Sequence, residues 1–310
     1  MSQPDVSVII PSFNTSDTLG AAIKSATQQT GVAVEVIVVD DCSQDNSAAI
    51  ANSFPDQTVK LFRHTENRGP GAARNTAIKN ATGTWLAMLD SDDTIESDRL
   101  HNMIGLADAN GAQIVVDNLN INYGDDCSIS PMFPPNDWAQ LSSISLADYI
   151  LGNTLFASTF NLGYLKPIIR RDFVVDHSLS YDEKLRIGED YLFAATALSM
   201  GARCCVHPIA GYNYHVRDGS ISRVLKLHHL HDMKTADTMF QEQADLNGAE
   251  MRAFKKRSKS IDEAISFLKL IEHLKARSPV KALKAVLSDP MAARHLRMPI
   301  AARWQRWVAN

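Results

Sequence analysis

The first 120 residues alternate short apolar runs, rich in β-branched residues, with segments of helical periodicity, and this alternation limits the possible folds more than any other feature. Strands are predicted at residues 6–10, 34–40, 59–63, 85–89 and 114–120. Helices are predicted between them, at residues 17–29, 45–53, 71–80 and 97–110. This β-α-β rhythm predicts an α/β fold in which helices cover both faces of a mainly parallel sheet.

The composition and the periodicity of the sequence change twice after residue 120. Residues 123–143 are rich in Asp, Ser, Pro and Asn, which predicts a long surface loop near the rim of an active site. Helices are then predicted at 146–151 and 190–200, and strands at 168–169, 203–207 and 211–215. After about residue 224 the chain becomes helical and basic. Ile261, Ala264, Ile265, Leu268 and Ile271 recur there at helical spacing, so this segment is expected to pack on another surface.

Composition and charge exclude several classes of protein. With 45% hydrophobic and 21% charged residues, the chain is neither disordered nor collagen-like. A net charge of −4 gives no reason to expect nucleic acid as a partner. None of the cysteines Cys42, Cys127, Cys204 and Cys205 has CxxC spacing, so reduced thiols are expected rather than a zinc site. The N-terminus does not resemble a signal peptide, and no apolar run approaches the roughly 20 residues that span a bilayer. The chain is therefore expected in the cytoplasm.

Polar residues follow three of the predicted strands, at the point where each strand ends. They lie within residues 11–14 (Pro-Ser-Phe-Asn), 40–43 (Asp-Asp-Cys-Ser) and 90–93 (Asp-Ser-Asp-Asp). Ligands of open parallel sheets bind beyond the carboxyl ends of the strands. Three separate segments are therefore predicted to meet at one edge of the sheet and to form a ligand site there.

The acidic strand end at residues 90–93 is the sharpest of these signals. Alternate residues that leave a strand point to the same side, so Asp90 and Asp92 could face one ion. Closely spaced carboxylates repel unless a cation or a proton neutralises them. Their hard oxygen ligands suit Mg²⁺ or Mn²⁺, which also bind phosphate. The alternative is a solvated acidic turn before the helix predicted from Ser97, and the β-α context favours the metal site.

Two neighbouring motifs suit a nucleotide, and each has a structural alternative. Asp40 and Asp41 could accept hydrogen bonds from a base or a ribose, or could cap the next helix. Residues 67–75 form a glycine-containing turn that opens a helix, and Arg74 lies one turn inside it. The backbone N–H groups and the dipole at such a site attract anions, and Arg74 could add charge against a diphosphate. The alternative is a tight helix start.

A second acidic pair, Glu189 and Asp190, opens a helix about a hundred residues later. A carboxylate at a helix N-terminus tends to stay ionised, which a general base requires, although plain capping is the common alternative. Further on, residues 214–222 gather hydrogen-bond donors and one potential metal ligand, His215. A lone histidine is more often structural.

Taken together, these motifs resemble family 2 glycosyltransferases, which have the GT-A fold, a Rossmann-like variant of the α/β sheet. This bacterial family builds exopolysaccharide, capsule and lipopolysaccharide glycans. The matching segments, in order, are VSVIIPSFN, VEVIVVDDCSQD, ENRGPGAARNTAI, WLAMLDSDD, IGEDYLF and YNYHVRDGSIS. They extend from Val6 to Ser222. The resemblance implies a GT-A catalytic domain at 1–223, with a nucleotide-sugar-binding half at about 1–120 and an acceptor half at about 121–223. A basic helical extension at 224–310 lies outside it.

The resemblance also implies roles for individual residues. Those expected around the uracil and ribose are Pro11, Phe13, Asn14 and Asp41, with Asp40 nearby. Arg74 is expected close to the phosphates. Asp90, with Ser91, would contact the ribose or the metal, and Asp92 would be the principal ligand of Mn²⁺ or Mg²⁺. Asp93 leaves the register of this motif open by one residue. Asp190, paired with Glu189, would be the general base, and His215 would meet the diphosphate or the metal.

The implied reaction is transfer of a hexose from a UDP-sugar, first of all UDP-glucose, to a hydroxyl of a glycan or lipid-linked oligosaccharide. A single displacement would invert the anomeric configuration. Three other classes of protein are alternatives. A sugar nucleotidyltransferase would need a glycine-rich basic loop after the first strand, and a dehydrogenase would need GxGxxG there; neither is present. A non-catalytic glycan-binding or nucleotide-sugar-binding member would be expected to lack the acidic motifs.

The C-terminal region suggests a partner surface. Residues 277–310 carry seven Lys or Arg residues against one acid, Asp289. On a helical wheel Ile300, Trp304, Trp307 and Val308 share one side, with Arg303 and Arg306 flanking them. This pattern, at 294–310, suits a helix resting on anionic lipid, which would place the protein on the inner face of the plasma membrane. The alternative is a helix that packs on the catalytic domain or on a second subunit in a homodimer.

Overall fold

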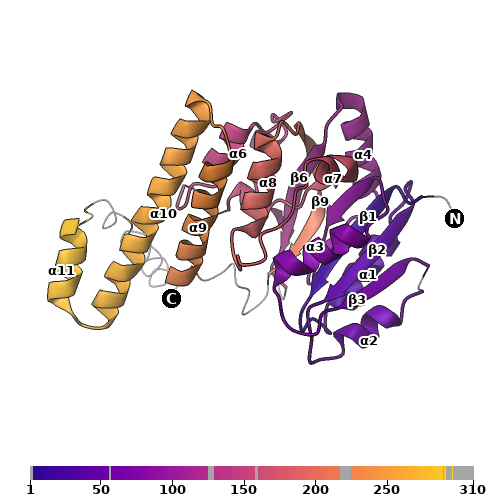
Figure 1. Ribbon diagram of the computed structural model, residues 1–310, viewed down its shortest axis with the longest axis horizontal. Helices are drawn as coiled ribbons and strands as arrows, with labels where there is room; N and C mark the ends of the chain where they lie inside the picture. Colours follow the sequence, from indigo (N-terminus) through magenta and orange to yellow (C-terminus); the bar gives the residue numbers. More distant parts are fainter. Residues whose placement is uncertain are drawn as a thin grey trace.

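The computed structural model describes residues 3–288, except 56, 125–128, 158–159 and 217–224, together with 290 and 295. These residues form a nine-stranded sheet with the order β3-β2-β1-β4-β8-β6-β9-β5, in which β7 pairs with β6 (Figure 1). The predicted α/β fold with a mainly parallel sheet is confirmed. The cysteine Cys127, and the predicted donors at 217–222, lie outside the described residues.

The N-terminal half contains the parallel part of the sheet. Its strands are β1 (Val6–Ser12), β2 (Val34–Asp40), β3 (Val59–Arg63) and β4 (Trp85–Met88). Its helices are α1 (Leu19–Thr27), α2 (Ser47–Asn52), α3 (Pro70–Asn80) and α4 (Arg99–Asn110). Within β2, every residue after Val34 is buried, because helices cover both faces of the strand. All of the predicted elements up to residue 120 are present, with shifts of only a few residues at their ends.

The second half adds antiparallel pairs to the sheet. Its strands are β5 (Thr94–Ile95), β6 (Ile114–Asn122), β7 (Ile129–Pro131), β8 (Ile168–Arg170) and β9 (Cys204–His215). The short strand β8 runs antiparallel between β4 and β6, and it joins the two halves of the sheet. The strands predicted at 203–207 and 211–215 are one strand, β9, which is parallel to β6. A register shift between Asp117 and Leu119 of β6 accommodates the irregular middle of β9.

The prediction of a long surface loop at residues 123–143 is wrong for its second part. That part contains β7 and the short helix α5 (Pro135–Trp138). The Trp138 ring is buried and stacks on Phe133, and its indole N–H donates to the carbonyl of His207 at 2.9 Å. The polar composition predicted exposure, but the tryptophan supplies enough apolar surface to anchor the segment on β9.

Helices dominate the remainder of the chain. They are α6 (Leu146–Gly152), the 3₁₀ helix η1 (Leu162–Tyr164), α7 (Arg171–Asp176), α8 (Glu189–Ser199), α9 (Leu227–Gln243), α10 (Gly248–Lys275) and α11 (Pro279–Ser288). In Figure 1, α9 and α10 lie beside α6 and α8, and α11 lies at the end of the molecule farthest from β3. As its apolar spacing predicted, α10 buries Ile261, Ala264 and Ile265.

The helices after residue 224 share the core of the sheet domain. Phe240 of α9 and Phe254 of α10 belong to the same buried cluster as the strands. The predicted catalytic domain (1–223) and helical extension (224–310) therefore pack together. The domain boundary at residue 223 stays a prediction. Within the described residues, no helix is both long enough and apolar enough to cross a membrane. Apart from His295, the lipid-binding helix predicted at 294–310 lies outside the described residues.

Candidate active site

Five charged side chains from four separate segments meet beyond the end of β4, and we call them the ion cluster. They are Arg74 of α3, Asp90 after β4, Lys166 before β8, and Glu189 and Asp190 at the start of α8. The predicted acidic strand end and the predicted acidic helix start are thus brought to one place. The two motifs are about a hundred residues apart in the sequence but adjacent in the folded chain.

Two cations bridge the carboxylates of the ion cluster. The Arg74 guanidinium lies 3.0 Å from Asp90, 3.1 Å from Glu189 and 3.3 Å from Asp190. The Lys166 ammonium lies 2.7 Å from Asp90 and 3.3 Å from Asp190. Asp90 and Asp190 therefore share both of their cationic partners, and the position of one carboxylate depends on the other.

Local structure explains why these side chains point to one place. Pro70 occupies the first turn of α3, where its missing N–H costs nothing, and Arg74 follows one turn later. Gly188 precedes α8 with φ of 91°, a left-handed conformation that suits glycine, and it starts the helix so that Glu189 and Asp190 fall in the first turn. The positive end of the helix dipole stabilises negative charge there.

Burial and neighbouring charges set the protonation of the ion cluster. Burial raises the pKa of the Asp90 carboxyl, but Lys166 and Arg74 outweigh it and lower that pKa to about 2. Burial and the charge of Asp190 raise the pKa of Glu189 to about 7, against the effect of Arg74. Asp90 is therefore an anion at neutral pH, whereas Glu189 keeps its proton to a higher pH than an ordinary glutamate.

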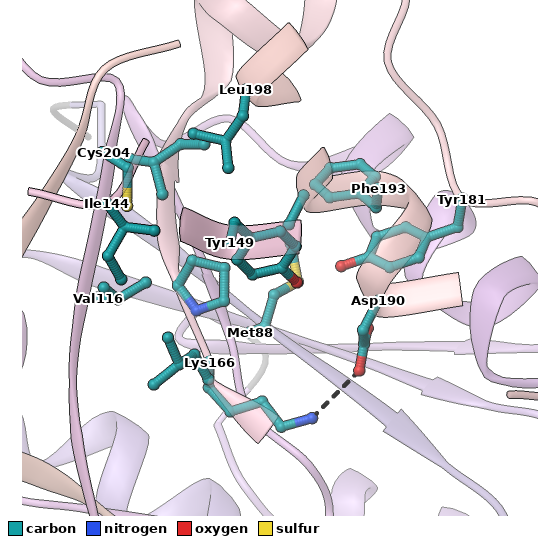
Figure 2. Close-up of a pocket in the computed structure, with 14 residues that line it drawn as sticks. Met88, Val116, Ile144, Tyr149, Lys166, Tyr181, Asp190, Phe193, Leu198 and Cys204 are labelled. Atoms are coloured by element: carbon teal, nitrogen blue, oxygen red, sulfur yellow. Dashed lines mark hydrogen bonds and ion pairs between the residues drawn. The ribbon is translucent and has the colours of Figure 1, made fainter. Parts of the chain in front are cut away.

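A small cavity of about 30 Å³ lies against the ion cluster (Figure 2). Most of its walls are apolar and come from β4, β6 and α8, and Tyr149, Tyr181, Lys166 and Asp190 supply its polar groups. Burial raises the pKa of both tyrosines, so their hydroxyls stay neutral. The volume has room for water rather than for a sugar ring.

The remaining residues of the acidic strand end have different environments. Asp93 is buried, and it accepts hydrogen bonds from the Tyr212 hydroxyl at 2.8 Å and from the backbone N–H of His215 at 2.9 Å. Burial, Asp90 and Asp92 raise the pKa of Asp93 to about 8. Ser91 is also buried, whereas Asp92 is half-buried. Asp93 therefore anchors this turn to β9. Of the two carboxylates, that of Asp92 is the more accessible.

His215 lies beside the same turn. Its Nε2 is 3.1 Å from the Thr94 hydroxyl, and its backbone is held by Asp93. Within the described residues, no group of three or more His, Cys, Asp or Glu side chains could hold a metal ion by itself. Magnesium sites at nucleotides, however, commonly use one or two carboxylates together with phosphate oxygens and water. The half-buried carboxylate of Asp92, next to Asp90, fits such a site.

The ends of β1 and β2 form a second polar region. Phe13 is 47% exposed, whereas Pro11 is half-buried. Asn14 has φ of 52°, its backbone N–H donates to the Ser43 hydroxyl, and its side-chain oxygen accepts from the backbone N–H of Gln44. The Asn14 side chain thus ties the two strand ends together, and the Phe13 ring is an exposed apolar group at this edge.

The two aspartates that end β2 are buried and bonded within the protein. Asp40 accepts from Arg63 at 2.8 Å and from the backbone N–H of Ser43. Asp41 accepts from the backbone N–H groups of Arg68 and Gly69 at 2.9 and 2.7 Å. These bonds fix the turn that leads into α3. In this structure, both carboxylates hold the loops at this edge of the sheet through hydrogen bonds within the protein.

The sequence analysis missed Lys166 as a member of the ion cluster and assigned its region only to the acceptor side. A weak signal was present, because Lys166 stands between the apolar residues Leu165 and Pro167 directly before a predicted buried strand. A lysine in such a position requires a buried anion nearby. Arg74 was expected beside a diphosphate, and the structure places its guanidinium among three carboxylates.

Three comparisons relate the chain to known proteins. The sequence model of glycosyl transferase family 2 matches residues 7–173. The chain is 50% identical over 307 residues to succinoglycan biosynthesis protein ExoO of Rhizobium meliloti (strain 1021), which covers 99% of this chain and 88% of that protein.

Solved structures of similar fold include two complexes with nucleotide sugars. The crystal structure of S. aureus TarS 1–349 in complex with UDP-GlcNAc has a TM-score of 0.66 at 20% identity, over 92% of this chain and 91% of that one. Mannosyltransferase PcManGT from Pyrobaculum calidifontis, in complex with GDP-Man and Mn²⁺, has a TM-score of 0.60 at 18% identity, over 100% of this chain and 84% of that one. The predicted GT-A fold is confirmed by this likeness.

Proposed function

Since the chain belongs to glycosyl transferase family 2 and is a glycosyltransferase, we propose that it moves a hexose from a UDP-sugar to a hydroxyl of a glycan or lipid-linked glycan. The name of the ExoO relative supports a role in exopolysaccharide synthesis, and the UDP-GlcNAc complex of TarS supports a UDP-sugar donor. The ion cluster is the observation that carries the proposal, because it joins the acidic strand end to the acidic helix start.

The acceptor side of the reaction is assigned to Asp190. Arg74 and Lys166 hold its two carboxylate oxygens, and the first turn of α8 adds the positive end of a dipole. In the proposed displacement, the acceptor oxygen bonds to the anomeric carbon as its proton passes to Asp190. The bond from that carbon to the diphosphate oxygen breaks with its electron pair, so UDP leaves from the opposite face. The configuration at the anomeric carbon is inverted.

The donor side is assigned to the ends of β1, β2 and β4. The exposed ring of Phe13 offers a face for the uracil, while Asn14, Asp40 and Asp41 shape the turns around it. Asp90 and Ser91, which follow β4 closely, are assigned to the ribose. Arg74 is already largely compensated by three carboxylates, so it acts on a diphosphate less than a solvated arginine would.

A divalent cation completes the proposed donor site. Asp92, with Asp90 and His215 beside it, would hold Mn²⁺ or Mg²⁺ in company with the diphosphate oxygens. The cation would supply positive charge against the developing charge of the leaving group. The Mn²⁺ complex of the mannosyltransferase supports this assignment by fold alone.

Donor turnover is the direct test of the proposed function. The purified chain would be incubated with UDP-glucose, UDP-galactose or UDP-GlcNAc, with Mn²⁺, Mg²⁺ or EDTA, and UDP release would be measured. We expect release with one of these donors and a divalent cation, and a loss of roughly 10²-fold or more in Asp190→Asn. Asp176→Asn, which changes an exposed carboxylate of α7, is the matched control. Donor binding without turnover would instead identify a binding protein, and neither binding nor turnover with any UDP-sugar would refute the donor class.

A further inference from the structure

The helix that begins with Glu189 and Asp190 is packed against the C-terminal helices. A Cβ atom added at Gly188, the residue before α8, would lie 3.6 Å from Ala236 and 3.7 Å from Met233, both of α9. The turn that starts α8 therefore rests directly on α9. A shift of α9 would move the first turn of α8, because closely packed helices transmit displacement.

A buried arginine reinforces this contact one residue beyond Asp190. The guanidinium of Arg257, on α10, lies 3.5 Å from the centre of the Tyr191 ring. Arg257 also forms an ion pair with Asp237 of α9. The side chains of Arg257 and Asp237 are only 4% and 3% exposed, so water does not screen the pair. One arginine thus holds three helices at the residue that follows the proposed base.

The same stack continues to the wall of the cavity. Tyr191 stacks on Tyr149 of α6, with ring centres 5.8 Å apart and planes 7° from parallel. Tyr149 lines the cavity together with Asp190 and Lys166 (Figure 2). A chain of side-chain contacts therefore runs from Asp237 through Arg257, Tyr191 and Tyr149 to the cavity beside the ion cluster. It involves α9, α10, α8 and α6 in that order.

The arrangement is not the most stable one available to a core. Within the described residues, neither Nε of Arg257 nor the hydroxyl of Tyr191 has a hydrogen-bond partner. Burial lowers the pKa of Arg257 and raises that of Tyr191, which shows the cost of removing these groups from water. Apolar residues of similar volume often replace a buried ion pair without loss of stability. The ion pair of Arg257 and Asp237 can orient α8, and apolar residues in its place would not do so.

We propose that Arg257, paired with Asp237, is a positioning residue that holds the first turn of α8 so that Asp190 faces Lys166. Arg257 acts through the ring of Tyr191 and touches neither donor nor acceptor. The kinetic consequence rests on the proposed function, because it assumes that Asp190 is the base. The structural consequence, restraint of the first turn of α8, does not depend on that assumption.

The central test replaces the pair by apolar residues in Asp237→Leu/Arg257→Met. We expect the melting temperature to stay equal or rise, whereas kcat falls about tenfold or more and KM for the donor stays within about twofold. Hydrogen exchange at the Leu192 amide, which donates to the carbonyl of Gly188, should become faster.

Two control variants separate positioning from general stability. Lys234→Met/Asp262→Leu removes an exposed ion pair between the same two helices, and we expect no change in kcat or exchange. Tyr191→Phe keeps the ring and removes only the unpartnered hydroxyl, so kcat should stay at the wild-type value. Tyr191→Leu removes the face on which Arg257 lies and should reproduce the loss of kcat.

The outcomes that overturn the proposal are distinct. An unchanged kcat in Asp237→Leu/Arg257→Met would refute it. A lower melting temperature with faster exchange throughout α8, α9 and α10 would show that Arg257 serves stability alone, and would also refute it. If the wild-type chain turns over no donor, the proposed function fails, but exchange at Leu192 still decides the positioning claim: an unchanged rate would refute it.

Discussion

At the scale of residues, the site depends on buried cations that neutralise several carboxylates at once. Lys166 is 8% exposed and contacts both Asp90 and Asp190. A buried ammonium is costly without an anion, and the two carboxylates that neutralise Lys166 are themselves only partly exposed. Each member of the ion cluster therefore needs the others.

Lys166→Met tests this mutual dependence. Removal of the ammonium leaves Asp90 and Asp190 with Arg74 as the remaining cation of the ion cluster, so we expect a loss of about 3–5 kcal/mol in the free energy of unfolding, measured by urea denaturation. Lys166→Arg keeps the charge and should recover part of the loss. Lys184→Met, at an exposed lysine, is the control. Equal unfolding curves for Lys166→Met and the control would contradict the assigned role.

Glu189 gives the site a pH dependence that can be measured without a substrate. Its pKa rises from an ordinary 4.5 to about 7 on folding, so between these values the folded chain binds a proton that the unfolded chain has released. Stability from this group is complete below pH 4.5 and is lost as the pH rises toward 7. The full change is on the order of 3 kcal/mol.

Glu189→Gln should abolish that part of the pH dependence. Urea denaturation of both proteins at several values from pH 5 to pH 7 would measure it. We expect the stability of the variant relative to wild type to increase with pH across this range. A constant difference would contradict the raised pKa. Asp93, whose pKa is also raised, is present in both proteins and does not enter the comparison directly.

At the scale of elements, the loop from β3 to α3 depends on one carboxylate, Asp41, which follows β2. Asp41 accepts from the backbone N–H groups of Arg68 and Gly69, and it lies 2.7 Å from Nδ1 of His64. Gly69 has φ of 95°, so this turn holds a backbone conformation that few residues adopt. The start of α3, and with it Arg74, is positioned by these bonds.

Asp41→Ala removes the acceptor for two backbone N–H groups. We expect a loss of about 2–4 kcal/mol in the free energy of unfolding, since buried donors would be left unsatisfied. Because Arg74 follows this turn, kcat should fall as well. Asp17→Ala, at an exposed carboxylate before α1, is the control. Wild-type stability in Asp41→Ala would show that the turn is held by other contacts.

At the scale of the whole molecule, the C-terminal end carries exposed apolar side chains. Val280, Leu283 and Leu287 of α11 are 79%, 61% and 71% exposed, and the exposed Lys281 and Lys284 lie beside them. The basic segment predicted to rest on lipid follows in the sequence. From these features we propose an anionic membrane surface, rather than a second subunit, as the partner of this end.

Deletion of residues 297–310 tests the membrane contact. The deletion removes Arg297, Arg303 and Arg306 with both C-terminal tryptophans, while His295, which packs on Phe156, remains. We expect sedimentation with phosphatidylglycerol vesicles to fall strongly, since each basic residue near an anionic surface contributes about 1 kcal/mol. Ile209→Asp, at an exposed position of β9, is the control. Unchanged vesicle binding after the deletion, or conversion of a dimer to a monomer, would refute the membrane contact.

Local patterns in the sequence determined most of the fold. The parallel strands β1 to β4 and the helices between them follow from apolar runs and from helical spacing, because each depends on residues close together in the chain. The strand ends at residues 11–14, 40–43 and 90–93 could also be predicted, since the carboxyl ends of parallel strands share one edge. The start of α8 at Glu189 was predicted to within one residue.

Which of these groups meet depends on contacts that form only in the folded chain. Lys166 joins Asp90 to Asp190 because β8 inserts antiparallel between β4 and β6, and no local pattern specifies that pairing. Arg74 turns toward carboxylates from α8, and Trp138 anchors a segment whose polar composition predicted a loop. Contacts between residues far apart in the chain carry no periodic signal, so burial and charge pairing in the folded molecule determined them.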